Sequence, residues 1–122
     1  MKVQKLTGAA LDWAVAVCEG YHSITIDVDS DGTKRINYGG MYPEWSTDWA
    51  HGGPIIDAER FNRITTNVSG GYTVSAKITF EENDEDRVVW VHGVGETVLI
   101  AAMRCYVAKH LGEMFTIPEE LT

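Results

Sequence analysis

The residues best suited to bind another molecule lie in one aromatic segment near the middle of the chain. Residues 42–56 combine three large aromatic side chains with short polar ones and a Gly-Gly pair. Aromatic rings offer stacking surfaces, short polar groups form hydrogen bonds, and glycine lets a backbone approach a ligand closely. We identify here a candidate ligand-binding wall made of Tyr42, Trp45, Ser46, Thr47, Asp48, Trp49, Gly52 and Gly53.

An alternative of equal weight is that these aromatic residues close the open end of a small core, with Ser46 or Thr47 capping a short turn. A small domain needs every large side chain for its core, so this interpretation assigns the segment no ligand.

Arg104 is the second candidate residue. It is the only charged residue between Val98 and Ala108. A buried arginine needs a partner for its guanidinium group. We favour a structural pair with a carboxylate such as Asp48 or Asp57, which would hold the aromatic segment in place. The alternative is that Arg104 neutralises an anionic ligand.

A short acidic motif, Asp-Val-Asp-Ser-Asp-Gly at residues 27–32, matches the opening of a calcium-binding loop. Asp27, Asp29 and Asp31 would be the ligands. The twelfth position, where such a loop needs a bidentate Glu, is Tyr38, and strand-like sequence flanks the motif instead of helices. We therefore expect an acidic hairpin turn and no metal site.

No motif for metal or nucleophilic catalysis is present. The four histidines are widely separated, and neither H-E-x-x-H, C-x-x-C nor G-x-S-x-G occurs. Residues 93–96, Gly-Val-Gly-Glu, lack the third glycine and the lysine of phosphate-binding loops, so we interpret them as a strand-to-helix connection. Cys18 and Cys105 are expected to be reduced core residues. We expect no catalytic residue, no cofactor and no enzymatic activity.

The charge balance limits the partners. Ten Lys and Arg residues against 18 Asp and Glu residues give a net charge of −8. Because phosphate binding needs clustered cations, we expect no direct contact with nucleic acid. No apolar run approaches the roughly 18 residues of a membrane span, and residues 1–6 lead into a helix, so we expect a cytosolic protein. The acidic run 81–86 is interpreted as a solvated turn; alternatively, it mimics nucleic acid and occupies a DNA-binding host protein.

Two helices are predicted from periodicity and capping. Thr7 caps the first helix and Gly20 closes it, with Leu6 and Leu11 at the spacing of a hydrophobic staple. Asp12 is expected to point away from its buried stripe. The second helix runs from Val98 to Leu111, with Thr97 as its cap and Gly112 at its end. It is so apolar that more than one side must be buried, which suggests a homodimer as one solution.

Strands and turns account for most of the remaining chain. Residues 23–28 and 34–38 read as a hairpin, and residues 72–80 and 87–92 as paired strands joined by the acidic run. Residues 39–54 read as an ordered loop. Residues 54–61 fit a short strand or a helical turn equally well. We predict one α+β domain over residues 1–122, with a small antiparallel sheet packed against the N-terminal and C-terminal helices.

Several of these segments resemble the NinX family of tailed bacteriophages and prophages. The resemblance is carried by residues 7–16, 19–21, 46–50, 52–56 and 99–108. It covers nearly the whole chain, with the hairpin near Asp29 and the strands from Ile64 to His92 as the variable part. Family members usually have Thr-Pro where this chain has Thr97 and Val98. The resemblance implies a phage accessory protein made in an infected bacterium; it implies no activity.

Two functions are consistent with these observations. The first is a non-enzymatic binder of a small anionic or nucleotide-like ligand, with a counter-defence role, whose pocket lies between the aromatic segment and the last helix. The second is an acidic protein–protein inhibitor or adaptor that acts on a host or phage factor. Either would act in the cytoplasm of the infected bacterial host.

Overall fold

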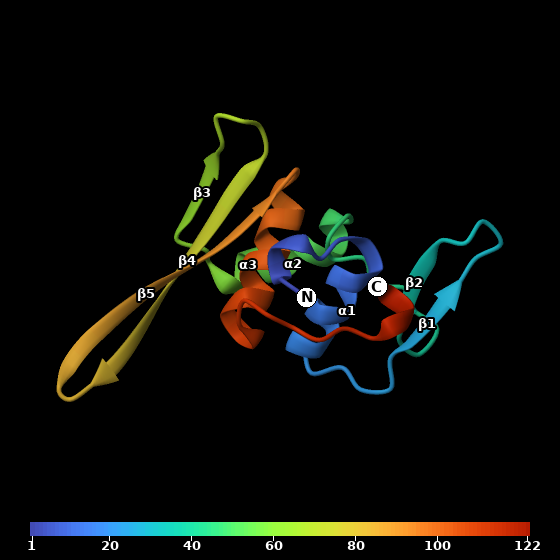
Figure 1. Ribbon diagram of the computed structural model, residues 1–122, viewed down its shortest axis with the longest axis horizontal. Helices are drawn as coiled ribbons and strands as arrows, with labels where there is room; N and C mark the ends of the chain where they lie inside the picture. Colours follow the sequence, from blue (N-terminus) through green and yellow to red (C-terminus); the bar gives the residue numbers. More distant parts are fainter.

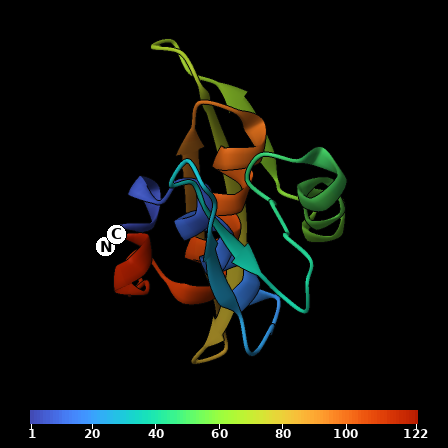
Figure 2. The same ribbon diagram turned by 90° about the vertical axis from the view of Figure 1, so that its right-hand side faces the viewer.

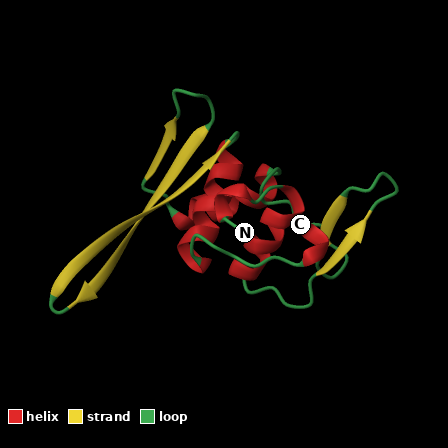
Figure 3. Cartoon of the chain, viewed as in Figure 1, coloured by secondary structure: helices red, strands yellow, loops and turns green.

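The computed structural model describes all residues, 1–122, and places three α-helices between two small antiparallel sheets (Figures 1 and 3). The α+β class predicted from the sequence is confirmed. The two sheets lie at opposite ends of the long axis of the molecule, with the helices in the middle. None of the helices is long and apolar enough to cross a membrane.

The first and last helices begin and end at the predicted residues, although the Thr7 side chain forms no capping hydrogen bond. Helix α1 (Gly8–Cys18) follows Thr7, and Gly20 takes a left-handed conformation just beyond its end. Leu6 and Leu11, the two residues of the hydrophobic staple, are both fully buried. In α3 (Val98–Leu111), the Thr97 hydroxyl accepts a hydrogen bond from the Ile100 amide at 3.1 Å, and Gly112 ends the helix.

A third helix, α2 (Trp49–Glu59), replaces residues 49–54 of the expected loop. The loop prediction for residues 39–54 is therefore wrong from Trp49 onward, and the ambiguity over residues 54–61 is settled in favour of a helix. The Asp48 carboxylate caps α2 by accepting a hydrogen bond from the Ala50 amide at 2.9 Å. Two glycines and Pro54 inside α2 hide it from a periodicity search, because glycine and proline disfavour helix interiors.

The strands form two separate sheets instead of one. Strands β1 (Thr25–Val28) and β2 (Lys34–Asn37) pair as the expected hairpin. Strands β3 (Arg63–Thr66), β4 (Tyr72–Glu82) and β5 (Glu85–Gly95) form the second sheet in the order β3-β4-β5. Most of the acidic run belongs to strands, because the turn between β4 and β5 consists of Asn83 and Asp84, both with positive φ.

Helix α3 lies directly on β4 and β5, whereas α1 packs against α3 and β2. The expectation that both helices cover one sheet is therefore wrong for α1. Gly93 explains the close approach of α3, because a Cβ atom there would collide with the backbone of Ala101 and Cys105. The layers run from the large sheet through α3 and α1 to the β1–β2 hairpin. The two termini lie side by side, and Lys2 forms a β-bridge with Met114 (Figure 2).

The far halves of β4 and β5 project from the helices as a two-stranded arm (Figure 1). We define the arm as residues 77–90. The pairing of β4 with β5 continues without a bulge from the body into the arm, from the pair Tyr72 and Gly95 to the pair Glu82 and Glu85. The arm therefore extends the face of the sheet that α3 covers and carries it beyond the end of the helix.

Candidate functional site

The aromatic segment is divided between core and surface. Trp45 is 6% exposed and belongs to the main core, where its ring lies 5.6 Å from that of Tyr21. Tyr21 in turn stacks on Tyr38 with ring centroids 4.4 Å apart. Trp45 therefore has its aromatic neighbours inside the protein. This placement matches the alternative interpretation, in which the aromatic residues complete a small core.

Asp12 holds this segment against α1. Its Oδ1 atom accepts a hydrogen bond from the Ser46 amide at 2.8 Å, and both residues are buried. Burial raises the pKa of the Asp12 carboxyl from its usual 3.8 to about 6, although the Ser46 amide opposes this shift. The expectation that Asp12 points away from the core is wrong. The buried Ser46 amide needs a hydrogen-bond acceptor, and the Asp12 carboxylate supplies it. The periodicity of a helix sequence carries no information about such a distant partner.

The Gly-Gly pair serves internal packing at one of its two positions. A Cβ atom at Gly52 would collide with the Trp45 carbonyl group and lie 2.6 Å from Leu99 Cδ2. At Gly53 the nearest atom, Trp49 Cε3, is 3.7 Å away. The close backbone approach that we assigned to a ligand is thus made by α2 to the core.

The other predicted residues of the segment face solvent. Tyr42, Thr47, Asp48 and Trp49 are all exposed. The Tyr42 hydroxyl donates a hydrogen bond to Asp27 Oδ2 at 2.8 Å, and Asp48 caps α2. Trp49 presents an exposed ring at the start of α2.

Arg104 lies away from the aromatic segment. Its Nε atom donates a hydrogen bond to the Leu6 carbonyl at 3.0 Å, and its Nη1 atom donates to the Val94 carbonyl at 2.5 Å. No ion pair forms with Asp48 or Asp57, so the pairing that we favoured is wrong. Burial lowers the pKa of Arg104. Two backbone carbonyls are its partners, and they tie the N-terminal segment to the end of β5.

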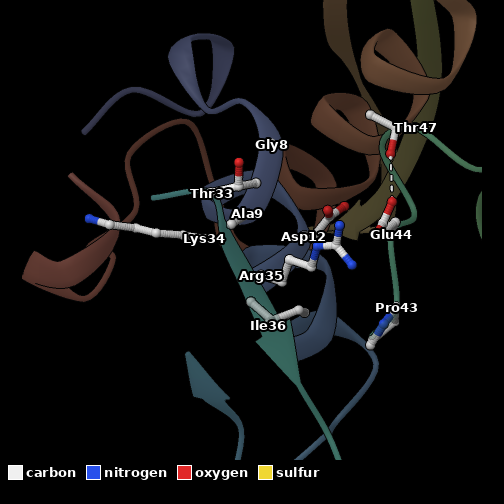
Figure 4. A pocket seen from close by; sticks show the side chains of 10 residues that line it. All are labelled: Gly8, Ala9, Asp12, Thr33, Lys34, Arg35, Ile36, Pro43, Glu44 and Thr47. Atoms are coloured by element: carbon white, nitrogen blue, oxygen red, sulfur yellow. Dashed lines mark hydrogen bonds between the residues drawn. The ribbon is translucent and has the colours of Figure 1, made fainter. Parts of the chain in front are cut away.

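The predicted residues line three different cavities. Tyr42 borders one beside β1, Thr47 borders one at the start of α1, and Arg104 borders one beside Gly70 and Gly71. In the cavity at the start of α1, Lys34 extends away from Asp12, while the Thr47 hydroxyl bonds to Glu44 (Figure 4). The residues therefore do not form the single pocket that we expected against the last helix.

The acidic motif at residues 27–32 forms a turn whose carboxylates already have partners. Asp27 accepts hydrogen bonds from Asn37 and Tyr42, and Asp31 accepts one from the Thr33 amide. These bonds lower the pKa values of both carboxyl groups. Asp29 forms an ion pair with Arg35 at 3.6 Å. No three His, Cys, Asp or Glu side chains gather anywhere in the chain as metal ligands would.

The arm carries uncovered apolar side chains on both of its faces. On the face that continues from α3, Ile78 and Val89 are half-buried, and Phe80 is 50% exposed. On the opposite face, Val88 is 44% exposed and Trp90 is 43% exposed, with the Arg63 guanidinium 5.7 Å from the Trp90 ring. Five carboxylates gather at the tip: Glu81, Glu82, Asp84, Glu85 and Asp86. Exposed apolar side chains that lie together on a surface are candidates for an interaction site.

Sequence reasoning named the acidic run 81–86 as an alternative docking element but not the apolar residues beside it, although a signal was present. Apolar residues occupy both alternating sets of positions from Ile78 to Trp90, so one covering helix could never bury them all. The 11-residue strands also exceed the usual length of about five to six residues.

Comparison with known proteins identifies the family. The family model described as "Bacteriophage P22, NinX" matches residues 2–110. The chain belongs to the NinX family. The matched region runs from η1 (Val3–Lys5) almost to the end of α3 and includes the whole arm. No curated protein matches this NinX chain.

Proposed function

We propose that this NinX protein is a non-enzymatic adaptor or inhibitor that docks on a host or phage protein through the arm, in the cytoplasm of the infected bacterium. The observation that carries this proposal is that β4 and β5 run past the end of α3. Val74, Ala76 and Val91 are buried beneath α3 and Ile78 is half-buried against the same core, whereas Phe80, next on the same face, is 50% exposed.

Apolar exposure on the arm favours association. Burying apolar surface contributes about 25 cal/mol per Å², and aromatic side chains such as Phe80 and Trp90 are the usual centres of protein interfaces. An isolated two-stranded ribbon is marginally stable in water. A partner that covers the arm would therefore gain binding energy and also stabilise the ribbon.

The charge of the arm indicates a positively charged partner. The five carboxylates of the tip face only one nearby cation, Arg87, which forms an exposed ion pair with Glu82 at 3.7 Å. Together with the net charge of −8, this tip attracts basic surfaces and repels nucleic acid. A DNA-binding protein presents such a basic surface, so inhibition by nucleic-acid mimicry is consistent with the charge of the tip.

Site-specific photo-cross-linking in infected cells tests this proposal. The photo-reactive residue p-benzoylphenylalanine replaces Phe80 on the arm or Trp49 on α2, two exposed aromatic positions. We expect a discrete protein adduct from position 80 and none from position 49. An adduct at position 49 alone would move the interface to the aromatic segment. No adduct at position 80 would refute docking through the arm.

A matched charge change tests the electrostatic part. The double variant Glu81→Gln and Glu85→Gln should weaken the position-80 adduct, most strongly at low salt, because the tip loses two charges. The control double variant Glu119→Gln and Glu120→Gln removes the same charge from the exposed C-terminal segment. Equal weakening in both variants would assign the effect to net charge and not to the arm.

A small anionic ligand is the second candidate function. The observation that favours it is the start of α1, which has no side-chain cap and no acidic residue in its first turn, beside Arg35. Helix N-termini attract anions. The cavity there has a volume of about 200 Å³, which suits an anion of phosphate size better than a nucleotide. The carboxyl groups of Asp12 and Glu44 in its lining oppose an anion, so Arg35 must supply the attraction.

Titration with inorganic phosphate tests this second candidate. We expect shifts of the Gly8 and Ala9 amide signals that disappear in Arg35→Ala and persist in Lys2→Ala. If the Arg35→Ala variant binds phosphate as well as the unmodified protein does, the site is not at α1.

A further inference from the structure

The outer edge of β5 is closed near the body of the protein by two side chains. Gln4 Nε2 donates a hydrogen bond to the His92 carbonyl at 2.8 Å, and the Val94 amide donates one to Gln4 Oε1 at 2.9 Å. Arg104 Nη1 donates to the Val94 carbonyl. The Gln4 amide thus pairs with β5 as a neighbouring strand would. The His92 carbonyl and both edge groups of Val94 are satisfied.

The same edge is open along the arm. In an antiparallel pair, the amide and carbonyl groups of alternate residues point away from the partner strand. The backbone amide and carbonyl groups of His92 and Val94 point away from β4. Because the register has no break, the backbone groups of Asp86, Val88 and Trp90 also point away from β4. No hydrogen bond from another element reaches the backbone of these three residues. Open edges of this kind accept additional strands.

The opposite edge of the arm, along β4, is a poorer acceptor. Asn62 Oδ1 accepts a hydrogen bond from the Lys77 amide at 2.8 Å and closes the edge where β3 ends. By the same alternation, only Thr79 and Glu81 remain outward-pointing on β4. The β5 edge is longer and carries two large apolar residues.

We propose that the β5 edge from Asp86 to Trp90 binds an extended segment of the partner protein as an added β-strand. This inference rests on the proposed docking function and specifies its binding mode. Asp86, Val88 and Trp90 share one face of the ribbon, so the segment carries apolar residues opposite Trp90 and Val88 and a Lys or Arg opposite Asp86. Backbone hydrogen bonds supply affinity, and these three cross-strand pairs supply specificity.

Charge selects a basic segment over a second copy of this chain. Two copies joined through β5 would bring together two chains of charge −8, and the only Lys or Arg of the strand, Arg87, is already paired with Glu82. A segment with Lys or Arg near the tip instead meets Glu85 and Asp86, which have no ion-pair partner. The geometry and the charge therefore favour the same occupant.

Backbone N-methylation of a peptide probe tests strand addition directly. The probe is a blocked peptide, Ile-Thr-Val-Thr-Lys-Thr-Lys, followed by amide NMR shifts of the full-length protein. We expect shifts of the Asp86, Val88 and Trp90 amides. A probe of the same sequence with alternate N-methylated amides keeps its side chains but cannot pair, and it should bind at least about tenfold more weakly.

A matched pair of proline variants locates the edge on the protein. Val88→Pro removes an outward amide of β5, and Thr79→Pro removes an outward amide of β4; neither amide belongs to the β4–β5 ladder. We expect Val88→Pro to abolish the shifts and Thr79→Pro to retain them. Equal binding of the N-methylated probe, or retention in Val88→Pro, would overturn strand addition.

The remaining outcomes separate the two proposals. A cross-link at position 80 together with no response to the peptide would overturn the added strand but leave docking through the arm in place. A change of native mass from dimer to monomer in Val88→Pro would show that a second copy occupies the edge, and would also overturn the inference. Loss of both the cross-link and the peptide response would refute docking and binding mode together.

Discussion

Asp12 makes the stability of the protein depend on pH in a direction opposite to that of most paired carboxylates. Its folded-state pKa of about 6 lies above the unfolded value of 3.8, so folding favours the protonated form. The cost of ionising the buried group is absent below pH 4, grows between pH 4 and pH 6, and is complete above pH 6. That cost reaches about 3 kcal/mol at neutral pH.

The variant Asp12→Asn should remove this dependence. Its amide oxygen still accepts the hydrogen bond from the Ser46 amide but carries no charge. We expect the variant to match the unmodified protein at pH 4 and to exceed its free energy of unfolding by up to about 3 kcal/mol at pH 7. Urea unfolding across this range measures the difference. Asp57→Asn, at an exposed position, is the control and should give a nearly flat difference.

Arg104 should act on stability whether or not an anion is present. Charge-assisted hydrogen bonds to the Leu6 and Val94 carbonyls contribute about 2 to 3 kcal/mol together. We expect Arg104→Ala to lower the free energy of unfolding by this amount in phosphate-free buffer. Arg104→Lys cannot bridge both carbonyls and should recover less than half of the loss. Full stability of Arg104→Ala would contradict the tether and reopen a ligand role for this residue.

At the scale of elements, helix α2 contains two adjacent glycines with opposite expected effects. Gly52→Ala would force a methyl group against the Trp45 carbonyl and Leu99, at a cost of about 1–3 kcal/mol. Gly53→Ala meets no atom closer than 3.7 Å and should stabilise α2 by about 0.5–1 kcal/mol, because alanine loses less conformational freedom than glycine. Thermal unfolding of the two variants compares them directly. Equal effects would mean that α2 does not lie against Trp45.

Elements with local signals were predictable from sequence, and those that depend on distant partners were not. Thr97 and Gly112 mark the ends of α3 because capping is local chemistry. Helix α2 depends on Asp48 and on packing against α3, which outweigh the low helix propensity of Gly52, Gly53 and Pro54. The single pocket expected from the sequence does not form, for the same reason. Trp45 packs on Tyr21, and Arg104 bonds to Leu6 and Val94, so contacts with distant parts of the chain place the two residues apart.

At the scale of the whole molecule, the two sheets are placed by the helices between them. Helix α3 contacts β4 and β5 on one side and α1 and α2 on others, so its apolar surface is covered within one chain. The reason we gave for a homodimer, an uncovered side of α3, is therefore removed. The uncovered apolar surface lies instead on the arm, which sequence periodicity identified as strands but could not place beyond the reach of α3.

The arm and its base should differ in local stability although they share the same two strands. At the base, the pair Val74 and Gly93 is buried against α3, whereas the pair Phe80 and Arg87 at the tip is exposed. Local opening of the tip exposes little new apolar surface, so it costs less free energy than opening of the base. We expect amide hydrogen exchange at Arg87 and Val89 to be about 100-fold faster than at Val91 and Gly93.

This exchange gradient also distinguishes a free arm from a self-associated one. If the arm is free, the gradient is independent of protein concentration, because no second molecule protects the tip. If a second copy covers it, protection at the tip rises with concentration by mass action, while the base, already near the global stability, changes little. A basic partner that docks on the arm should slow amide exchange at the tip and leave the base unchanged. An exchange gradient that is independent of protein concentration and disappears when such a partner is added would therefore connect the uncovered arm to docking.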